Sequence, residues 1–306
     1  MEAPVTEEGI RHIENYLGQG DIDAALPELL ELRDAVEDYA KDACVTTDEV
    51  QFFSFADMFE RLAYRRVERD PRTLVQVDAP FDRVYADLAF AYSAQREYGL
   101  ARDALKQAVR WDPMNCAYRL DLAELYRVLG DEDEWGALAY SVLERAADAV
   151  LFGRACAALG QFFLNREEPL LAAGYARRAA AFAPREEATR ALLERLMQEA
   201  PDAAEASDEE TARALGEQGL SGEPNAEIAI CLLMCATDAA RAGDRDAATR
   251  YTLRARDLVG EDACSALIRL IRESDAELAS ERGAGAAGAA AAAPQDAGEG
   301  DAHAES

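Results

Sequence analysis

The sequence predicts an all-α protein, and three observations carry that prediction. Apolar residues recur three and four positions apart along most of the 306 residues, the spacing that places them on one face of a helix. Glycine and proline fall between these periodic stretches, where helices end. Strand-like alternation occurs only at 73–78, and one strand cannot form a sheet. We therefore expect about a dozen or more short helices of about 11 to 14 residues.

Two segments of the chain, 82–115 and 153–186, repeat one pattern at identical offsets. In the first segment the shared positions are Leu88, Ala89, Tyr92, Ala101, Leu105, Ala108 and Pro113. In the second segment they are Leu159, Gly160, Phe163, Ala172, Ala176, Ala179 and Pro184. The copy between them supplies Leu122, Ala123, Tyr126 and Gly130. It exceeds a period of about 34 residues by about three, and we expect this surplus within 131–136.

This pattern resembles that of the tetratricopeptide repeat family, in which Leu-Gly, Tyr, Ala, Phe and Pro recur at these spacings. Small residues such as Ala89, Gly160 and Ala172 allow two helix backbones to approach each other. The rings of Tyr92 and Phe163 then fill the gap to the next helix, and proline ends the second helix of each pair. The resemblance implies a right-handed α-solenoid of antiparallel helix pairs whose concave face binds peptides.

The repeats divide the chain into four regions. Residues 1–81 are predicted to form divergent helical repeats, 82–186 the core repeats, and 187–281 further divergent repeats. Within the third region, 201–224 is rich in Asp, Glu, Ser and Gly and is predicted to be a hinge or an insertion. Residues 261–281 are expected to form a capping helix, and the Gly, Ala and acid-rich tail 282–306 is expected to be disordered.

Phenylalanine is concentrated in one short segment, with four of the ten within 52–59. Phe52, Phe55 and Phe59 stand at helical spacing, and Leu62 continues the same stripe. We interpret this stripe as core packing of a helix in preference to an exposed peptide groove. On such a helix Phe53 points away from the stripe, and it is therefore the candidate for an exposed ring.

The charge of the chain excludes several classes of function. Lys and Arg total 32 against 60 Asp and Glu, so the formal net charge is −28. Such a surface repels nucleic acid and anionic membranes. No secretory signal or membrane span is recognised. The six cysteines contain no CxxC pair and are expected to be reduced, mostly buried thiols, so we expect a cytoplasmic protein.

Several motifs have a non-functional interpretation that we favour. Gly283, Gly285 and Gly288 have dinucleotide-site spacing, but no strand precedes them. Asp131 and Asp133 imitate the start of a calcium loop, but its fifth and twelfth positions are Trp135 and Val142, which cannot chelate calcium. The acids at 131–134 are therefore expected to cap a helix start.

Candidate catalytic and metal-binding residues are equally few. Cys231 and Cys235 share a helical face, but their apolar neighbours favour a buried helix over a metal site. The two histidines, His12 and His303, lie at opposite ends of the chain, which argues against a His-based active site. Among 60 acids no pair is singled out for acid–base catalysis. We therefore expect no enzyme activity, no cofactor and no metal.

The concave face is the candidate binding site, because the resemblance places peptide binding there. The residues expected to line it are Arg83, Phe90, Glu124, Arg127, Arg154, Gln161 and Asn165. Family members that hold a chaperone's C-terminal carboxylate use Lys and Asn on this face, whereas this chain has Ala86, Phe90 and Glu124. That clamp is not supported, but the arginines favour an acidic or C-terminal peptide.

Three hypotheses for function follow. The favoured one is a non-catalytic scaffold or adaptor that binds a protein or peptide partner on the concave face. The alternative is an enzyme or metal-binding protein on an α-solenoid, using the abundant carboxylates or the six cysteines. The third is a purely structural subunit whose concave face is filled by its own segment 201–224.

Overall fold

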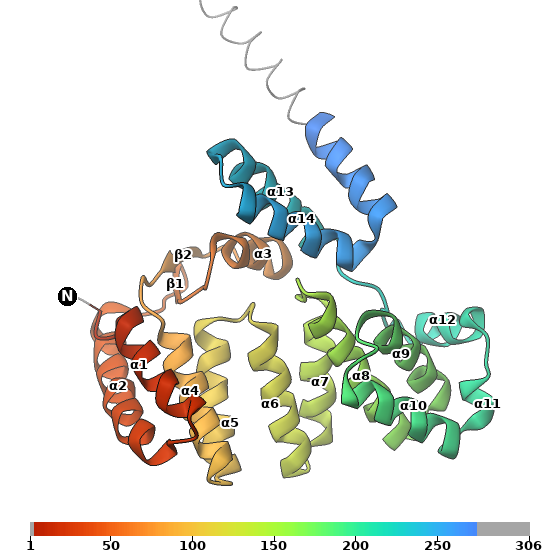
Figure 1. Cartoon of the computed structure of the whole chain (residues 1–306), viewed down its shortest axis with the longest axis horizontal. Coiled ribbons are helices and arrows are strands. Elements are labelled where there is room, and N and C mark those ends of the chain that lie inside the picture. Colours follow the sequence, from red (N-terminus) through yellow and green to blue (C-terminus); the bar gives the residue numbers. More distant parts are fainter. Residues whose placement is uncertain (1–2, 274–306) are drawn as a thin grey trace, which may run out of the picture. The chain divides into compact units, whose positions relative to one another are not determined.

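The structure, a computed structural model that describes residues 3–273, confirms the predicted α-solenoid (Figure 1). Four antiparallel pairs form the stack: α1 (Glu7–Gly18) with α2 (Ile22–Ala43), α4 (Phe81–Ala94) with α5 (Tyr98–Trp111), α6 (Cys116–Leu129) with α7 (Glu132–Leu143), and α8 (Ala149–Asn165) with α9 (Pro169–Phe182). Then follow α10 (Glu187–Glu199), α11 (Pro201–Ala204), α12 (Asp208–Glu217), α13 (Ala226–Ala242) and α14 (Arg245–Val259).

Side-chain caps and glycine set the limits of the helices in the stack. The carboxylate of Asp148 accepts hydrogen bonds from the first backbone amides of α8, and the side-chain oxygen of Asn115 does the same for α6. These caps satisfy amides that have no partner within the helix. At the other end of α6, Gly130 has a φ of 83°, a left-handed conformation that glycine adopts without steric cost.

The small residues of the repeat allow close helix packing, as the sequence predicted. Leu88, Leu122 and Leu159 hold equivalent positions in α4, α6 and α8 and are at most 4% exposed. A Cβ atom added to Gly160 would lie 2.4 Å from Cδ2 of Leu192 in α10. A larger residue at this position would therefore push α8 and α10 apart.

The three surplus residues of the middle repeat do not lie in 131–136, so that prediction is wrong. Helix α8 has 17 residues, whereas α4 and α6 have 14 each. Asp148 caps α8 ahead of the position that the repeat predicts. The surplus therefore lengthens the N-terminal end of α8 and leaves the start of α7 in register.

The segment between α2 and α4, residues 44–80, forms an insertion that corrects two predictions. It contains β1 (Val50–Phe53), α3 (Met58–Glu68) and β2 (Thr73–Gln76), and the two strands pair in parallel. The strand-like run at 73–78 therefore has a partner. Phe52 and Phe53 belong to β1 and share no helical stripe with Phe59, and Phe53 is 4% exposed. Because residues alternate in direction along a strand, Phe53 points into the core instead of into solvent.

The C-terminal helices leave the regular stacking order. Segment 201–224 contains α11 and α12, and both helices pack on α9. The α13–α14 hairpin instead returns to the insertion and packs on α3 (Figure 1). The ring of Phe59 in α3 lies 6.3 Å from that of Tyr251 in α14, and the guanidinium of Arg254 lies over Phe59.

Residues 262–273 belong to a second unit, separate from the one formed by the preceding residues. The chain is helical at 261–273. The remainder of the predicted capping helix, the tail 282–306 and the glycines at 283, 285 and 288 lie outside the described residues.

Candidate protein-binding surface

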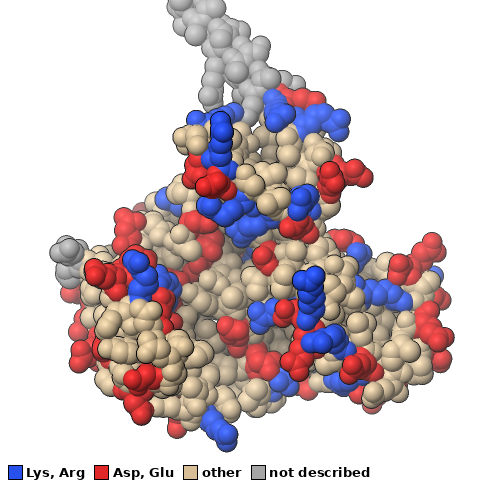
Figure 2. Space-filling model, viewed as in Figure 1, with Lys and Arg blue, Asp and Glu red and all other residues tan. Residues whose placement is uncertain are grey.

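The first helices of three successive pairs, α4, α6 and α8, carry all the residues predicted for the concave face. We call the side of these helices that bears those residues the inner face. Figure 2 shows a recess between two flanking lobes, at the place where Figure 1 draws α6. The buried leucines Leu88, Leu122 and Leu159 point into the stack. Two positions further along each helix are Phe90, Glu124 and Gln161, which therefore form a row across the inner face.

Phe90 is the apolar member of this row, and its side chain is 55% exposed. Glu124 is exposed, and Gln161 is half-buried with its amide donating a 3.5 Å hydrogen bond to the Ala188 carbonyl of α10. The row thus combines one exposed aromatic ring with polar groups on both following helices.

Arg83 is held by the first helix pair. Its Nε and Nη2 atoms donate hydrogen bonds of 2.9 and 2.6 Å to Glu14, and Nη1 donates one of 2.6 Å to Glu7. Its side chain is 28% exposed. Arg83 therefore joins α1 to α4 and presents only part of its guanidinium to the inner face.

The other two arginines of the predicted site also have carboxylate neighbours. Arg127 forms an ion pair with Glu124 one turn earlier on α6. Arg154 lies between Asp121 and Glu186, 4.0 Å from each. The structure thus brings these arginines to one surface and pairs each of them within the chain.

Asn165 closes the row of predicted residues at the C-terminal end of α8. Its side-chain oxygen accepts a 3.3 Å hydrogen bond from Arg195 of α10. The predicted residues therefore all lie on α4, α6 or α8, but their hydrogen bonds connect them to α1 and α10.

Asp87 is a feature of α4 that the sequence interpretation missed. Its Oδ2 atom is buried and accepts no hydrogen bond within residues 3–273. Burial, with the Glu14 carboxylate adding to it, raises the pKa of Asp87 to about 7. Its equivalent one repeat later, Asp121, is exposed and lies 4.0 Å from Arg154, so the repeat pattern alone does not distinguish the buried carboxyl group.

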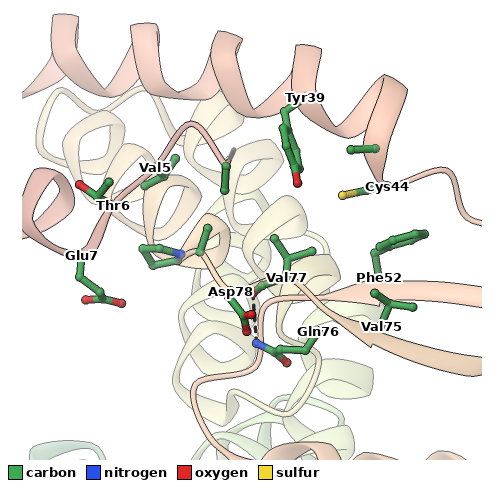
Figure 3. Close-up of a pocket in the computed structure, with 14 residues that line it drawn as sticks. Val5, Thr6, Glu7, Tyr39, Cys44, Phe52, Val75, Gln76, Val77 and Asp78 are labelled. Carbon is green, nitrogen blue, oxygen red and sulfur yellow. Dashed lines mark hydrogen bonds between the residues drawn. The ribbon is translucent and has the colours of Figure 1, made fainter. Parts of the chain in front are cut away.

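A cavity of about 600 Å³ lies beside the insertion (Figure 3). Val5, Tyr39 and Cys44 approach it from the N-terminal segment and the end of α2, while Phe52 and Val75 line it from the two strands (Figure 3). The Gln76 amide donates a 3.1 Å hydrogen bond to the Val77 carbonyl beside it. Burial raises the pKa of the Cys44 thiol in this cavity, which keeps the thiol protonated at neutral pH.

The rejected motifs have structural roles where the structure describes them. Asp131 caps α7 and accepts a hydrogen bond from the Glu134 amide, as predicted for an acidic helix start. Cys231 is fully buried in α13, and burial raises the pKa of both Cys231 and Cys235 to about 11. Within residues 3–273, no group of three or more His, Cys, Asp or Glu side chains is placed to hold a metal ion.

Known proteins resemble the chain only distantly. No family model and no curated protein matches the chain. A solved structure titled "Functional Characterization of Pseudomonas Aeruginosa pilF" is 15% identical, covers 88% of this chain and 96% of its own, and has a TM-score of 0.45. A likeness at this level does not indicate what the present chain binds. Among the helices of the described residues, none has the length and apolarity needed to cross a membrane.

Proposed function

We propose that the chain binds a segment of another protein along the inner face of α4, α6 and α8, and acts as a non-catalytic scaffold or adaptor. The observation that carries this proposal is Phe90, whose aromatic side chain is 55% exposed on the helix face that bears the row. Exposed apolar side chains on a concave surface are typical of sites that bind peptides. Glu124 and Gln161 continue the row and offer hydrogen bonds that would fix the register of a bound segment.

The chemistry of the proposed partner follows from the arginines. The Arg127–Glu124 pair is 44% and 55% exposed, and exposed ion pairs contribute only about 0 to 1 kcal/mol. A carboxylate of the partner can therefore replace Glu124 on Arg127 at little cost. We expect an acidic or C-terminal segment that also places an apolar side chain on Phe90.

We also propose a reducing compartment such as the cytoplasm. Cys44, Cys116, Cys156 and Cys231 are buried free thiols, and reduced cysteines are the rule in the cytosol.

Site-specific photocrosslinking tests the location of the binding surface. A photoreactive phenylalanine analogue at position 90 should give a crosslinked partner band, whereas the same analogue at Leu100 should not. Leu100 is a matched control because it is 49% exposed on α5, outside the inner row. Crosslinking at 100 but not at 90 would place the interface elsewhere.

Charge reversal tests the chemistry of the site. The double variant Arg127→Glu/Arg154→Glu should lose at least about tenfold in affinity for the crosslinked partner, the size of one lost charge-assisted contact of about 1.5 to 3 kcal/mol. Arg102→Glu should leave affinity unchanged, because Arg102 lies on α5, outside the row of Phe90, Glu124 and Gln161, and pairs with Asp103. Unchanged affinity of the double variant would contradict the proposed role of the arginines.

A further inference from the structure

The cavity beside the insertion has the size of a small-molecule site. Its volume of about 600 Å³ lies within the range of about 300 to 1,000 Å³ that is usual for ligand pockets. Three parts of the chain line it: residues of 3–7, the end of α2 with Cys44, and the two strands with residues 77–80 (Figure 3). The cavity is therefore formed where the insertion lies against the first helix pair.

Apolar side chains line the cavity from both sides. Val5, Cys44 and Val77 are at most 7% exposed and belong to its buried wall. Phe52 and Val75 lie opposite each other on β1 and β2, and both are half-buried. Their side chains therefore share one face of the two-stranded sheet. Together these residues can remove the apolar body of a ligand from water.

Most of the polar side chains at the cavity already have partners. The Thr6 hydroxyl caps α1, and the Gln76 amide donates hydrogen bonds to two backbone carbonyls. Glu7 forms an ion pair with Arg83. These groups therefore have little capacity left for a ligand.

The Tyr39 hydroxyl and the Asp78 carboxylate are the two unoccupied polar groups. Both residues line the cavity, and neither side chain forms a hydrogen bond or ion pair with another residue of 3–273. Tyr39 extends from α2 toward the strands (Figure 3), and its ring makes an edge-to-face contact with Phe81. Asp78 follows β2 and is exposed. The cavity thus offers a hydroxyl group from α2 and a free negative charge from the insertion.

The charges around the cavity favour a cation. Among its described lining residues there is no Lys or Arg. Arg83, beside the cavity, is bound by Glu7 and Glu14. Arg110 interacts electrostatically with Cys44, but it is not a lining residue and lies over the Trp111 ring. The net charge of −28 further concentrates cations near the protein and repels anions.

The aromatic rings of Tyr39 and Phe52 line the same space. The π electrons of such rings attract ammonium groups, and sites for organic cations commonly combine aromatic rings with a carboxylate. An anion would instead meet Asp78 with no cation to balance it. A metal ion would find only one unoccupied carboxylate, and no group of three metal-binding side chains occurs within residues 3–273.

We propose that this cavity binds a small organic cation, an ammonium group on an apolar body. The apolar body lies against Phe52 and Val75, and the ammonium group donates hydrogen bonds to the Asp78 carboxylate. The Tyr39 hydroxyl provides a second polar contact on the α2 side. This inference is independent of the binding surface proposed on α4, α6 and α8.

NMR titration of the full chain with three probes of similar shape tests the charge preference. The probes are phenethylammonium, its neutral analogue 2-phenylethanol and the anion phenylacetate, at about pH 7 and about 0.15 M salt. We expect phenethylammonium to bind at least about tenfold more tightly than 2-phenylethanol, because only the cation can pair with Asp78. Phenylacetate should not bind measurably.

Substitution of Asp78 tests which group selects the cation. Asp78→Asn should weaken the binding of phenethylammonium about tenfold and leave that of 2-phenylethanol unchanged. The matched control is Asp48→Asn, which neutralises another exposed acid of the insertion outside the cavity lining and should change neither affinity. Asp78 is exposed and has no partner among the described residues, so both variants should fold as the wild-type chain does.

Filling the cavity tests its location. Val75→Trp places a larger side chain in the space and should abolish the binding of both phenethylammonium and 2-phenylethanol. If that variant does not fold, Phe52→Ala removes one aromatic wall and should weaken the binding of both probes about tenfold.

Several outcomes would overturn the proposal. They are the absence of phenethylammonium binding to the wild-type chain, equal affinities for the cation and the alcohol, and an affinity for the cation that Asp78→Asn leaves unchanged. An equal loss in Asp48→Asn would show a general effect of net charge instead of a site. Unchanged binding in the folded cavity variant would place the bound probe elsewhere.

Discussion

The helix stack α4–α9 and the insertion 44–80 each have a buried interior, but different interactions hold the two interiors together. In the stack, Ala101, Ala108, Ala172 and Ala179 are fully buried between neighbouring helices, so the contact is apolar and close. In the insertion, Gln51 and Ser54 are buried polar residues. Close packing of small side chains stabilises the stack, whereas the insertion also depends on hydrogen bonds between its buried polar groups.

Because of this difference, the two regions should respond differently to amino-acid substitutions. A repeat contacts only its neighbours, and its core positions follow a local pattern. The insertion joins strands 23 residues apart, with Val50 opposite Thr73. Its Ser54 forms one polar cluster with Asp82 of α4 and Tyr118 of α6. Loss of one polar partner there leaves another buried group unsatisfied.

The largest expected effect is in the stack. Leu88 is 1% exposed, and Leu88→Asp removes its packing and buries a charge, at a cost of about 5 kcal/mol or more. A cost of that size approaches the whole stability of a typical domain. We expect loss of the helical circular dichroism signal and of the cooperative transition in urea.

Phe90→Asp is the matched control, two residues away on the same helix. Because Phe90 is 55% exposed, its change should alter the free energy of unfolding by no more than about 0.5 kcal/mol. Equal destabilisation by the two substitutions would show that α4 does not have the buried and exposed faces described above.

A smaller effect is expected in the insertion. Ser54 is 3% exposed, and its hydroxyl oxygen lies 2.6 Å from the Ala79 carbonyl and 2.9 Å from Asp82 Oδ1. It also accepts a 3.2 Å hydrogen bond from the Phe81 amide. Ser54→Ala removes this hydroxyl from the buried Asp82 carboxyl group, while the Phe81 amide keeps its 2.9 Å hydrogen bond to the Ala79 carbonyl. We therefore expect a loss of about 1 to 3 kcal/mol in urea denaturation.

Thr249→Ala provides the comparison for this change. The Thr249 hydroxyl is exposed and bonds only within α14, to the Arg245 carbonyl, and alanine is the better helix former. The free energy of unfolding of the Thr249→Ala variant should equal that of the wild-type chain or exceed it by at most about 0.5 kcal/mol. A Ser54→Ala variant as stable as Thr249→Ala would contradict the role of the polar cluster.

The stack could be predicted from the sequence because its signal is local and repeated. Leu88 and Leu159 occupy the same offset in two copies, and both are buried. The insertion could not be predicted in this way. Phe52, Phe55 and Phe59 have helical spacing, but the parallel pairing of β1 with β2 outweighed this spacing. Long-range pairing of this kind is not encoded in local periodicity.

The candidate sites show the same contrast. The helices that carry Phe90, Glu124 and Gln161 followed from the repeat, but the ion pairs of Arg83 with Glu7 and Glu14 on α1 did not.

The smallest effect is expected where the insertion meets the α13–α14 hairpin through charge. Arg66 of α3 and Glu227 of α13 are 3.4 Å apart and 44% and 43% exposed, so solvent screens their attraction. Arg66→Gln should cost no more than about 0.5 kcal/mol in urea denaturation, and the cost should decrease further in high salt. The apolar contact of Phe59 with Tyr251 is left intact by this change. A loss of about 2 kcal/mol or more would instead mean that the ion pair, and not the aromatic contact, holds the hairpin on the insertion.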